Sequence, residues 1–243
     1  MYIAIIAATV AAAVLLTVVP TFYYKYMRLY KAAPVGGGQG LVLSFDDGPD
    51  PEYTPLLLDL LQKEQVRATF FVTAENAAAH PELLARMRDE GHIVGFHSLR
   101  HDNMMLLSPR ATKRQFEEGL RVVDTEWFRP PYGFVNLFTL HYARKYGQKI
   151  VLWNVIPRDW RRDVSSEELL HRLRASARDG AVILLHDGCG GAAADRTAPR
   201  RTLTALAVLL PELKNAGYRF LTVADCDTRP LCAGFTNKYN VTG

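Results

Sequence analysis

Residues 41–49 read LVLSFDDGP and join a short apolar run to two adjacent carboxylates and a turn. The run over 41–46 has the length of a buried strand, and Gly48-Pro49 marks the turn that ends it. A strand that is apolar on both faces is typical of a parallel sheet covered by helices. The pair Asp46-Asp47 therefore lies at the carboxyl end of such a strand, although alone it also fits an ordinary turn.

The same strand-like pattern recurs along the chain. Strands are predicted over residues 41–46, 67–73, 92–97, 127–129, 149–155, 181–186 and 218–223. The amphipathic stretches between them predict helices over 54–65, 81–90, 109–124, 136–146, 165–178 and 202–216. This alternation predicts an α/β fold, a distorted (β/α)7-8 barrel built on a parallel sheet. An open doubly wound sheet is the alternative.

Composition limits the class of protein. A chain of 243 residues is long enough for one domain with a substantial core, and 49% apolar with 22% charged residues excludes disordered, collagen-like and coiled-coil chains. Three cysteines exclude a multi-disulfide scaffold. The net charge is +4, but Lys25, Arg28 and Lys31 precede residue 36 without any acid, so the remainder is nearly neutral. No nucleic-acid-binding surface is therefore expected.

The first segment predicts a membrane anchor. The stretch from Ile3 to Phe22 carries no charge, and as a helix it measures about 30 Å, the thickness of a bilayer core. Tyrosines and the three basic residues follow it, as at a membrane interface. Because no basic residue precedes it, the positive-inside rule predicts that the rest of the chain lies in the cytoplasm. A cleaved signal peptide and an extracytoplasmic location are the alternatives.

Polar side chains follow several predicted strands at their carboxyl ends. They are Asp46-Asp47, His97, Arg129, Asp159 and His186-Asp187. In barrels of parallel strands these ends form one rim, where active sites lie. The group therefore predicts a functional site at that rim.

One carboxylate and two imidazoles of this group match a metal site. Asp47, His97 and His101 offer the set of two histidines and one acid that holds Zn²⁺ or a similar ion with open positions. The spacing of the histidines predicts a helical turn with both rings on one face. Ser98 stands where the zinc-protease motif needs Glu, which excludes a metalloprotease. Taken alone, the two histidines also fit a loop pair that caps a helix.

The other rim residues supply acid–base chemistry. Beside a metal ion, Asp46 can take a proton from water as general base, with Arg129 holding it ionised and oriented. His186 can protonate a leaving nitrogen, and Asp159 can stabilise its imidazolium. Together these roles describe the hydrolysis of an amide.

Five motifs in this order and spacing resemble those of the polysaccharide deacetylases (carbohydrate esterase family 4, with the NodB-homology domain). They are Leu43-Ser-Phe-Asp-Asp-Gly-Pro49, His97-Ser-Leu-Arg-His101, Arg129-Pro-Pro-Tyr132, Asp159-Trp160 and Leu184-Leu-His186. The resemblance covers residues 41–225. It implies metal-dependent removal of the N-acetyl group from an N-acetylhexosamine on a distorted barrel.

The resemblance also implies roles for the catalytic residues. Asp46 is the catalytic base, positioned by Arg129, and His186 is the general acid, tuned by Asp159. The backbone N–H of Tyr132 stabilises the oxyanion of the tetrahedral intermediate.

A metal site and an acetyl pocket are implied in the same way. Trp160 and Leu184 wall the pocket for the acetyl methyl group. The metal is zinc, with cobalt, nickel or manganese as alternatives, and its ligands are Asp47, His97 and His101.

The chain departs from the family pattern in three ways. Ile156 stands where the fourth motif usually carries a second Asp, which puts the hydrogen bonding of that motif in doubt. The stretch between His101 and Arg129 is short for the family, so the groove wall it contributes is expected to be trimmed. Cys189 closely follows His186, the implied general acid, and we interpret this cysteine as incidental rather than as a metal ligand or redox switch.

We therefore divide the chain into a transmembrane anchor (1–24), a basic juxtamembrane segment with a glycine-rich linker (25–40), a deacetylase catalytic domain (41–225) and a tail (226–243). The expected partners are the membrane and an amino-sugar glycan, either linked to a polyprenyl phosphate or part of the cell wall. The basic residues Arg158, Arg161 and Arg162 fit either a solvated face or a site for that phosphate. A deformylase acting on a lipid-linked amino sugar and a catalytically silent glycan-binding module are the alternative functions.

Overall fold

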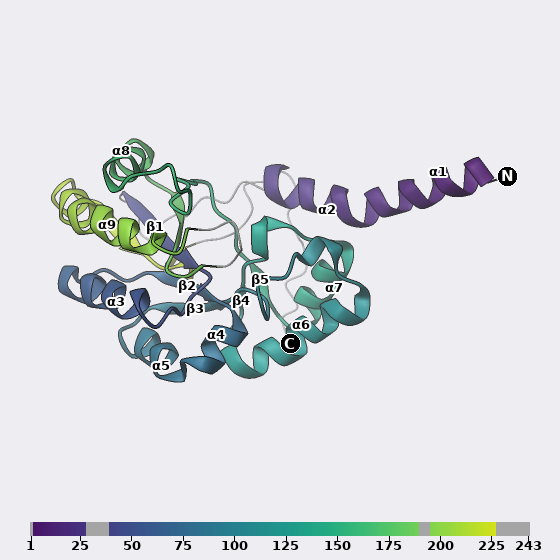
Figure 1. Cartoon of the computed structure of the whole chain (residues 1–243), viewed down its shortest axis with the longest axis horizontal. Coiled ribbons are helices and arrows are strands. Elements are labelled where there is room, and N and C mark those ends of the chain that lie inside the picture. Colours follow the sequence, from purple (N-terminus) through teal and green to yellow (C-terminus); the bar gives the residue numbers. More distant parts are fainter. Residues whose placement is uncertain (1, 28–38, 190–194, 227–243) are drawn as a thin grey trace, which may run out of the picture.

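The computed structural model describes residues 2–27, 39–189 and 195–226, and Figure 1 draws a curled sheet with helices around it and one helix projecting from the domain. Seven parallel strands form the sheet: β1 (Gly40–Asp46), β2 (Thr69–Val72), β3 (Ile93–Phe96), β4 (Trp127–Phe128), β5 (Lys149–Ile150), β6 (Ala181–His186) and β7 (Arg219–Leu221). Most of the predicted linker, with Arg28 and Lys31, and most of the predicted tail lie outside the described residues.

Strand β1 is the centre of the sheet. The strand order is β5-β4-β3-β2-β1-β6, and β7 pairs with the start of β1. One edge of β1 pairs with β6 over residues 41–46, while the other edge pairs first with β7 and then with β2. All seven residues of β1 are buried, in agreement with the apolar run that predicts this strand.

The sheet curls into an incompletely closed barrel. Beyond the end of β5, Val155 forms a single parallel bridge to Ile183 of β6, which joins the two outer edges of the sheet. The predicted distorted barrel is therefore confirmed, and the alternative of an open doubly wound sheet is wrong. Strand β5 is shorter than the predicted 149–155 because the carbonyls of residues 151 and 152 accept hydrogen bonds from the Arg129 guanidinium.

Helices cover the outside of the barrel (Figure 1). They are α3 (Tyr53–Glu64), α4 (Ala74–Ala79), α5 (Pro81–Asp89), α6 (Pro109–Val123), α7 (Leu137–Lys145), α8 (Ser166–Ser176) and α9 (Ala198–Asn215). Local capping sets their starts: Ser108 Oγ accepts from the Ala111 N–H before α6, and Asn136 and Thr139 form a capping box before α7. Helix α4 was not predicted because six residues are too few to show a helical period.

The two faces of β1 have different environments. Leu41, Leu43 and Phe45 join the main core cluster, which also contains the buried side chains of α3 and α9. Val42 belongs to a second, smaller cluster on the inner face of the sheet. Because side chains alternate along a strand, Asp46 points to the same side as Val42. The barrel interior therefore changes from apolar to polar toward the carboxyl ends of the strands.

The N-terminal segment is helical throughout its described part. It consists of α1 (Tyr2–Ala13), a π-helical turn η1 (Val14–Val18), α2 (Val19–Phe22) and a second π-helical turn η2 (Tyr23–Met27). Over Tyr2–Lys25 it is long and apolar enough to cross a membrane, with a mean hydropathy of 2.6, properties that a signal sequence shares. Helix α1 projects from the domain in Figure 1, whereas Pro20 and Thr21 are buried against it.

Candidate active site

The register of the strands brings the predicted residues to one rim. Asp46 of β1 pairs with His186 of β6, and the last residues of β3 and β4 pair with each other, so that His97 and Arg129 follow side by side. A cavity of about 990 Å³ opens at this rim. The predicted site residues that line it are Asp46, Asp47, His97, His101, Tyr132, Trp160, Leu184 and His186. Arg129 and Asp159 are fully buried behind it.

Three of these side chains form a compact set of possible metal ligands. Asp47 Oδ1 lies 3.5 Å from His97 Nε2 and 3.3 Å from His101 Nε2. One ligand atom of each residue lies within 4.8 Å of the others, which no other trio of His, Cys, Asp and Glu achieves in the described part of the chain. Two imidazole nitrogens and a carboxylate oxygen are donors that zinc and other first-row divalent ions accept.

The orientation of His97 favours this use. Its Nδ1 lies 2.7 Å from the carbonyl oxygen of Arg129 and donates its proton there, which leaves the lone pair of Nε2 directed to Asp47. Burial lowers the pKa of His97 to about 3, so the ring is neutral, as a metal ligand must be. The residues present therefore fit a divalent ion.

The segment that carries the two histidines is a strained turn. The predicted helical turn over 97–101 is wrong, because Ser98 and His101 have φ values of 71° and 61°, in the left-handed region that an α-helix excludes. Gln115 of α6 supports this turn, since its Oε1 accepts a hydrogen bond from the Leu99 N–H at 2.8 Å. The backbone strain brings the two rings to a centroid distance of 5.2 Å, so both can reach one ion.

Asp46 lies beside this set but is held by a different partner. Its Oδ1 accepts a hydrogen bond from Arg129 Nη1 at 2.7 Å, while its Oδ2 lies 3.6 Å from His97 Nε2. Burial raises the pKa of Asp46 above its ordinary value, and the charge of Arg129 opposes the rise. The carboxylate is thus oriented and more basic than an exposed one, which suits a general base.

Arg129 is fully buried, and its guanidinium is bonded on several sides. It also donates to Ser44 Oγ at 2.9 Å and to two backbone carbonyls after β5 at 3.3 and 3.4 Å. It lies over the ring of Phe71, 4.0 Å from the centroid. Ser44 was missed in the sequence, although strand alternation puts it on the same face as Asp46 and could have revealed it.

His186 reaches the cavity from the end of β6. Its Nδ1 lies 2.9 Å from Asp159 Oδ1, while Asp159 Oδ2 accepts from the His186 backbone N–H at 2.8 Å and from Thr202 at 3.1 Å. Burial alone lowers the pKa of His186, but the charge and hydrogen bond of Asp159, with Asp47 and Asp46 adding to them, raise that pKa to about 10. The ring is protonated at neutral pH, as a general acid must be.

This pair predicts the effect of Asp159→Asn on the pH profile. Without the carboxylate charge, the pKa of His186 falls from about 10 toward its ordinary value of 6.5, so the variant loses its acid form as the pH rises through the neutral range. The alkaline limb of kcat/KM against pH therefore moves to lower pH. Thr202→Val, which removes a hydrogen bond but no charge, is the control, and an equal displacement by both variants would contradict this reading.

Aromatic and aliphatic side chains complete the cavity. Tyr132 lies in the turn η4 (Pro131–Gly133) with a φ of 60°, and its ring contacts that of His101 at a centroid distance of 4.6 Å. Trp160 lies 5.1 Å from His186 by ring centroids, and Leu184 is a buried part of the wall. The structure thus brings these three predicted residues together, and their roles toward a substrate stay predictions.

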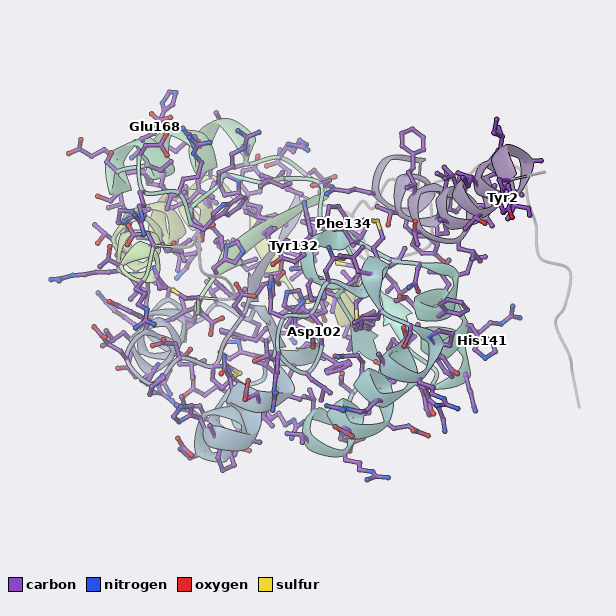
Figure 2. All side chains as sticks on the ribbon, turned by 45° about the vertical axis from the view of Figure 1, so that its right-hand side comes forward. Tyr2, Asp102, Tyr132, Phe134, His141 and Glu168 are labelled. Carbon is purple, nitrogen blue, oxygen red and sulfur yellow. The ribbon has the colours of Figure 1, made fainter. Side chains whose placement is uncertain are left out.

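The cavity also contains residues that the sequence did not indicate. Lys25 and Phe134 line it, and Figure 2 labels Phe134 with Tyr132 between the barrel and the end of the N-terminal helix. Their proximity depends on packing between segments more than a hundred residues apart, so no local pattern could reveal it. Among the described residues, Arg158 and Arg162 border the cavity without an ion pair, whereas Arg161 binds Asp163 through two 2.7 Å contacts.

Two departures from the family pattern have structural consequences. Ile156, in place of the second Asp, is 42% exposed and lines the cavity, while Asp159 is held by His186 and Thr202 without it. Cys189 is exposed and its Sγ lies 3.7 Å from the Asp195 carbonyl oxygen, outside the ligand set described above.

Comparisons with known proteins place the chain among its relatives. The sequence profile of the polysaccharide deacetylase family matches residues 35–151. A peptidoglycan-N-acetylglucosamine deacetylase of Bacillus cereus is 36% identical over 193 residues, which cover 76% of this chain and 86% of that protein. A chitooligosaccharide deacetylase of Sinorhizobium fredii is 35% identical over 192 residues, which cover 75% of this chain and 89% of that protein.

Solved structures share the fold. The Bc1960 peptidoglycan N-acetylglucosamine deacetylase superposes with a TM-score of 0.74 at 30% identity, over 84% of this chain and 95% of that one. The peptidoglycan deacetylase PdaC of Bacillus subtilis gives a TM-score of 0.67 at 31% identity, over 76% of this chain and 88% of that one. By sequence and by fold, the chain belongs to the polysaccharide deacetylase family.

Proposed function

We propose that the protein is a metal-dependent carbohydrate de-N-acetylase that hydrolyses the N-acetyl amide of an N-acetylhexosamine in a glycan. The observation that carries the proposal is the pair of adjacent carboxylates with separate partners. Asp47 faces His97 and His101, while Asp46 is bonded to the buried Arg129. Such a division of work, with one acid as ligand and the other as base, is what metal-assisted amide hydrolysis needs.

The chain's own residues account for the proton transfers. Asp46 accepts a proton from the attacking water, whose oxygen forms a bond to the carbonyl carbon. The Tyr132 N–H donates to the oxyanion that develops on the acetyl oxygen. His186 gives its proton to the amide nitrogen as the carbon–nitrogen bond breaks, so that acetate and a free amino sugar result. A divalent ion, zinc by preference, supplies Lewis acidity at the Asp47, His97 and His101 site when bound.

The acyl group favoured by the pocket is acetyl. Trp160 and Leu184 both line the cavity next to His186, the proposed acid. Burial of a methyl group against such an apolar wall stabilises the bound substrate by about 0.8 kcal/mol for each carbon removed from water. A formyl group has no methyl carbon to bury there, so the pocket favours deacetylation over deformylation.

The proposed substrate is a GlcNAc-type sugar presented at a membrane, first as a lipid-linked glycan and otherwise as a cell-wall glycan. Two relatives are named for peptidoglycan N-acetylglucosamine and chitooligosaccharides, which supports an amino-sugar glycan. The apolar helix over Tyr2–Lys25 supports a single-pass anchor, and the basic residues after it support a cytoplasmic catalytic domain. Arg158 and Arg162 at the cavity edge offer unpaired cations, within the described chain, for a phosphate on the substrate.

Acetate release by the full-length protein in lipid nanodiscs tests the proposal. We expect acetate from a polyprenyl-diphosphate N-acetylglucosamine, and formate release from the N-formyl analogue at a lower kcat/KM. Turnover of free chitopentaose with none of the lipid-linked sugar would refute the lipid-linked substrate. No acetate from either substrate, with the metal supplied, would refute the deacetylase itself. Protease accessibility in sealed vesicles shows on which side of the membrane the catalytic domain lies. A domain outside the cytoplasm would favour a cell-wall glycan as the substrate.

A further inference from the structure

The end of the N-terminal helix is bonded to the turn that carries Tyr132. Thr21 Oγ1 donates to the Val135 carbonyl oxygen at 2.6 Å and accepts from the Val135 N–H at 2.9 Å. Both residues are buried, and they lie 114 positions apart in the chain. A threonine in a membrane-spanning helix normally bonds back to its own helix, as Thr9 does to the carbonyl of Ile5 at 2.9 Å. Thr21 instead bonds to the catalytic domain.

Lys25, one helical turn further, contacts the same segment. Its Nζ donates to the Tyr132 carbonyl oxygen at 3.0 Å and lies 4.5 Å from the centroid of the Phe134 ring. It also lines the catalytic cavity. Side chains of the helix are therefore hydrogen-bonded to backbone atoms at both ends of the segment 132–135.

These contacts bear on the proposed oxyanion donor. The turn's own backbone bonds run from the Gly133 and Phe134 N–H groups to residues 130 and 131, so they fix its shape. The position of the turn on the rim depends on its contacts with other elements. Tyr132 has a left-handed φ of 60° and is 48% exposed, its ring contacts that of His101, and Pro131, Gly133 and Val135 beside it are buried. The bonds from Thr21 and Lys25 add polar restraints to this packing.

We propose that Thr21 and Lys25 are positioning residues of the active site, so that the membrane helix is a working part of the enzyme as well as a tether. The proposal rests on the proposed function, because it assigns the helix to the oxyanion step of amide hydrolysis. A donor that is held before the reaction stabilises the transition state without further reorganisation.

Thr21→Val tests the proposal in the full-length protein in nanodiscs. Valine keeps the volume but neither donates nor accepts, so both bonds to Val135 are lost. We expect kcat for acetate release to fall about tenfold with KM unchanged, since loss of a whole oxyanion donor reduces kcat about a hundredfold or more. Thr21→Ser, which keeps the hydroxyl, restores kcat, and Lys25→Met lowers it as Thr21→Val does. Thr9→Val, outside the contact, behaves as wild type.

A measurement independent of turnover accompanies this assay. Hydrogen exchange at the Val135 amide, protected by Thr21 Oγ1, speeds up in Thr21→Val and stays slow in Thr21→Ser and Thr9→Val. Wild-type kcat together with unchanged Val135 exchange in Thr21→Val overturns the inference while the deacetylase proposal stands. An inactive wild type with metal supplied refutes the proposed function instead, and the exchange result then still decides whether the helix is docked.

Discussion

Asp46→Asn leaves metal binding intact and lowers kcat for acetate release by about a thousandfold, the loss typical of a removed general base. The amide oxygen of asparagine can still accept the hydrogen bond that Arg129 Nη1 gives to Asp46 at 2.7 Å. The proposed ligand set of Asp47, His97 and His101 is untouched. The variant therefore separates the proton acceptor from the metal site. The measurements are acetate release at saturating substrate and metal content by mass spectrometry.

The control for Asp46→Asn is the same substitution at the neighbouring Asp47. Asp47→Asn removes a ligand charge one position along the chain, so it lowers metal affinity where Asp46→Asn does not. Turnover by Asp46→Asn near the wild-type rate would remove the base from the mechanism. Loss of the ion from Asp46→Asn would mean that both carboxylates are ligands.

His101→Ala weakens the proposed metal site, so it loses activity at metal concentrations that saturate the wild type. Its Nε2 lies 3.3 Å from Asp47 Oδ1, and its side chain is 11% exposed, so its removal disturbs the core less than removal of the deeply buried His97. Because even an outer-shell partner of a metal ligand contributes about 10–100-fold in affinity, we expect a loss of a hundredfold or more for a ligand. Metal titration followed by acetate release measures both effects.

Thermal unfolding in chelator gives the matching control. Without an ion, His101→Ala is expected to unfold at a lower temperature than the wild type, because the lost ring is only 11% exposed and contacts the Tyr132 ring. Added metal then stabilises the wild type more than the variant, since an ion that binds only the folded state raises stability by mass action. Equal stabilisation of the two proteins would show that the ion binds elsewhere.

The proximity of four candidate site residues could be predicted because each of them ends a strand or directly follows one. In a parallel barrel the carboxyl ends of all strands meet at one rim, so Asp46, His97, Arg129 and His186 are near each other whatever the loops do. The fold was predictable for the same reason, since buried strands such as 41–46 differ clearly from amphipathic helices. The strand pairing of Asp46 with His186 is the direct result.

Other features depend on tertiary contacts that no local pattern contains. The turn after His97 has a helical spacing, but left-handed φ values at Ser98 and His101 override it, and Gln115 of α6 supports the result. Strand β5 ends early because the carbonyls after it bond to the buried Arg129. The docking of Lys25 on the Tyr132 turn joins segments 107 positions apart. Hydrophobic periodicity indicates which residues are buried, but it does not indicate which side chain forms a hydrogen bond with a given backbone group.

The most direct test of the account is the return of acetate release when metal is titrated into chelator-treated, full-length protein in nanodiscs. With Asp47, His97 and His101 holding one ion next to Asp46, the chelated protein is inactive and activity rises in proportion to added zinc until one ion is bound per chain. Undiminished acetate release by the chelated, metal-free protein would contradict the account.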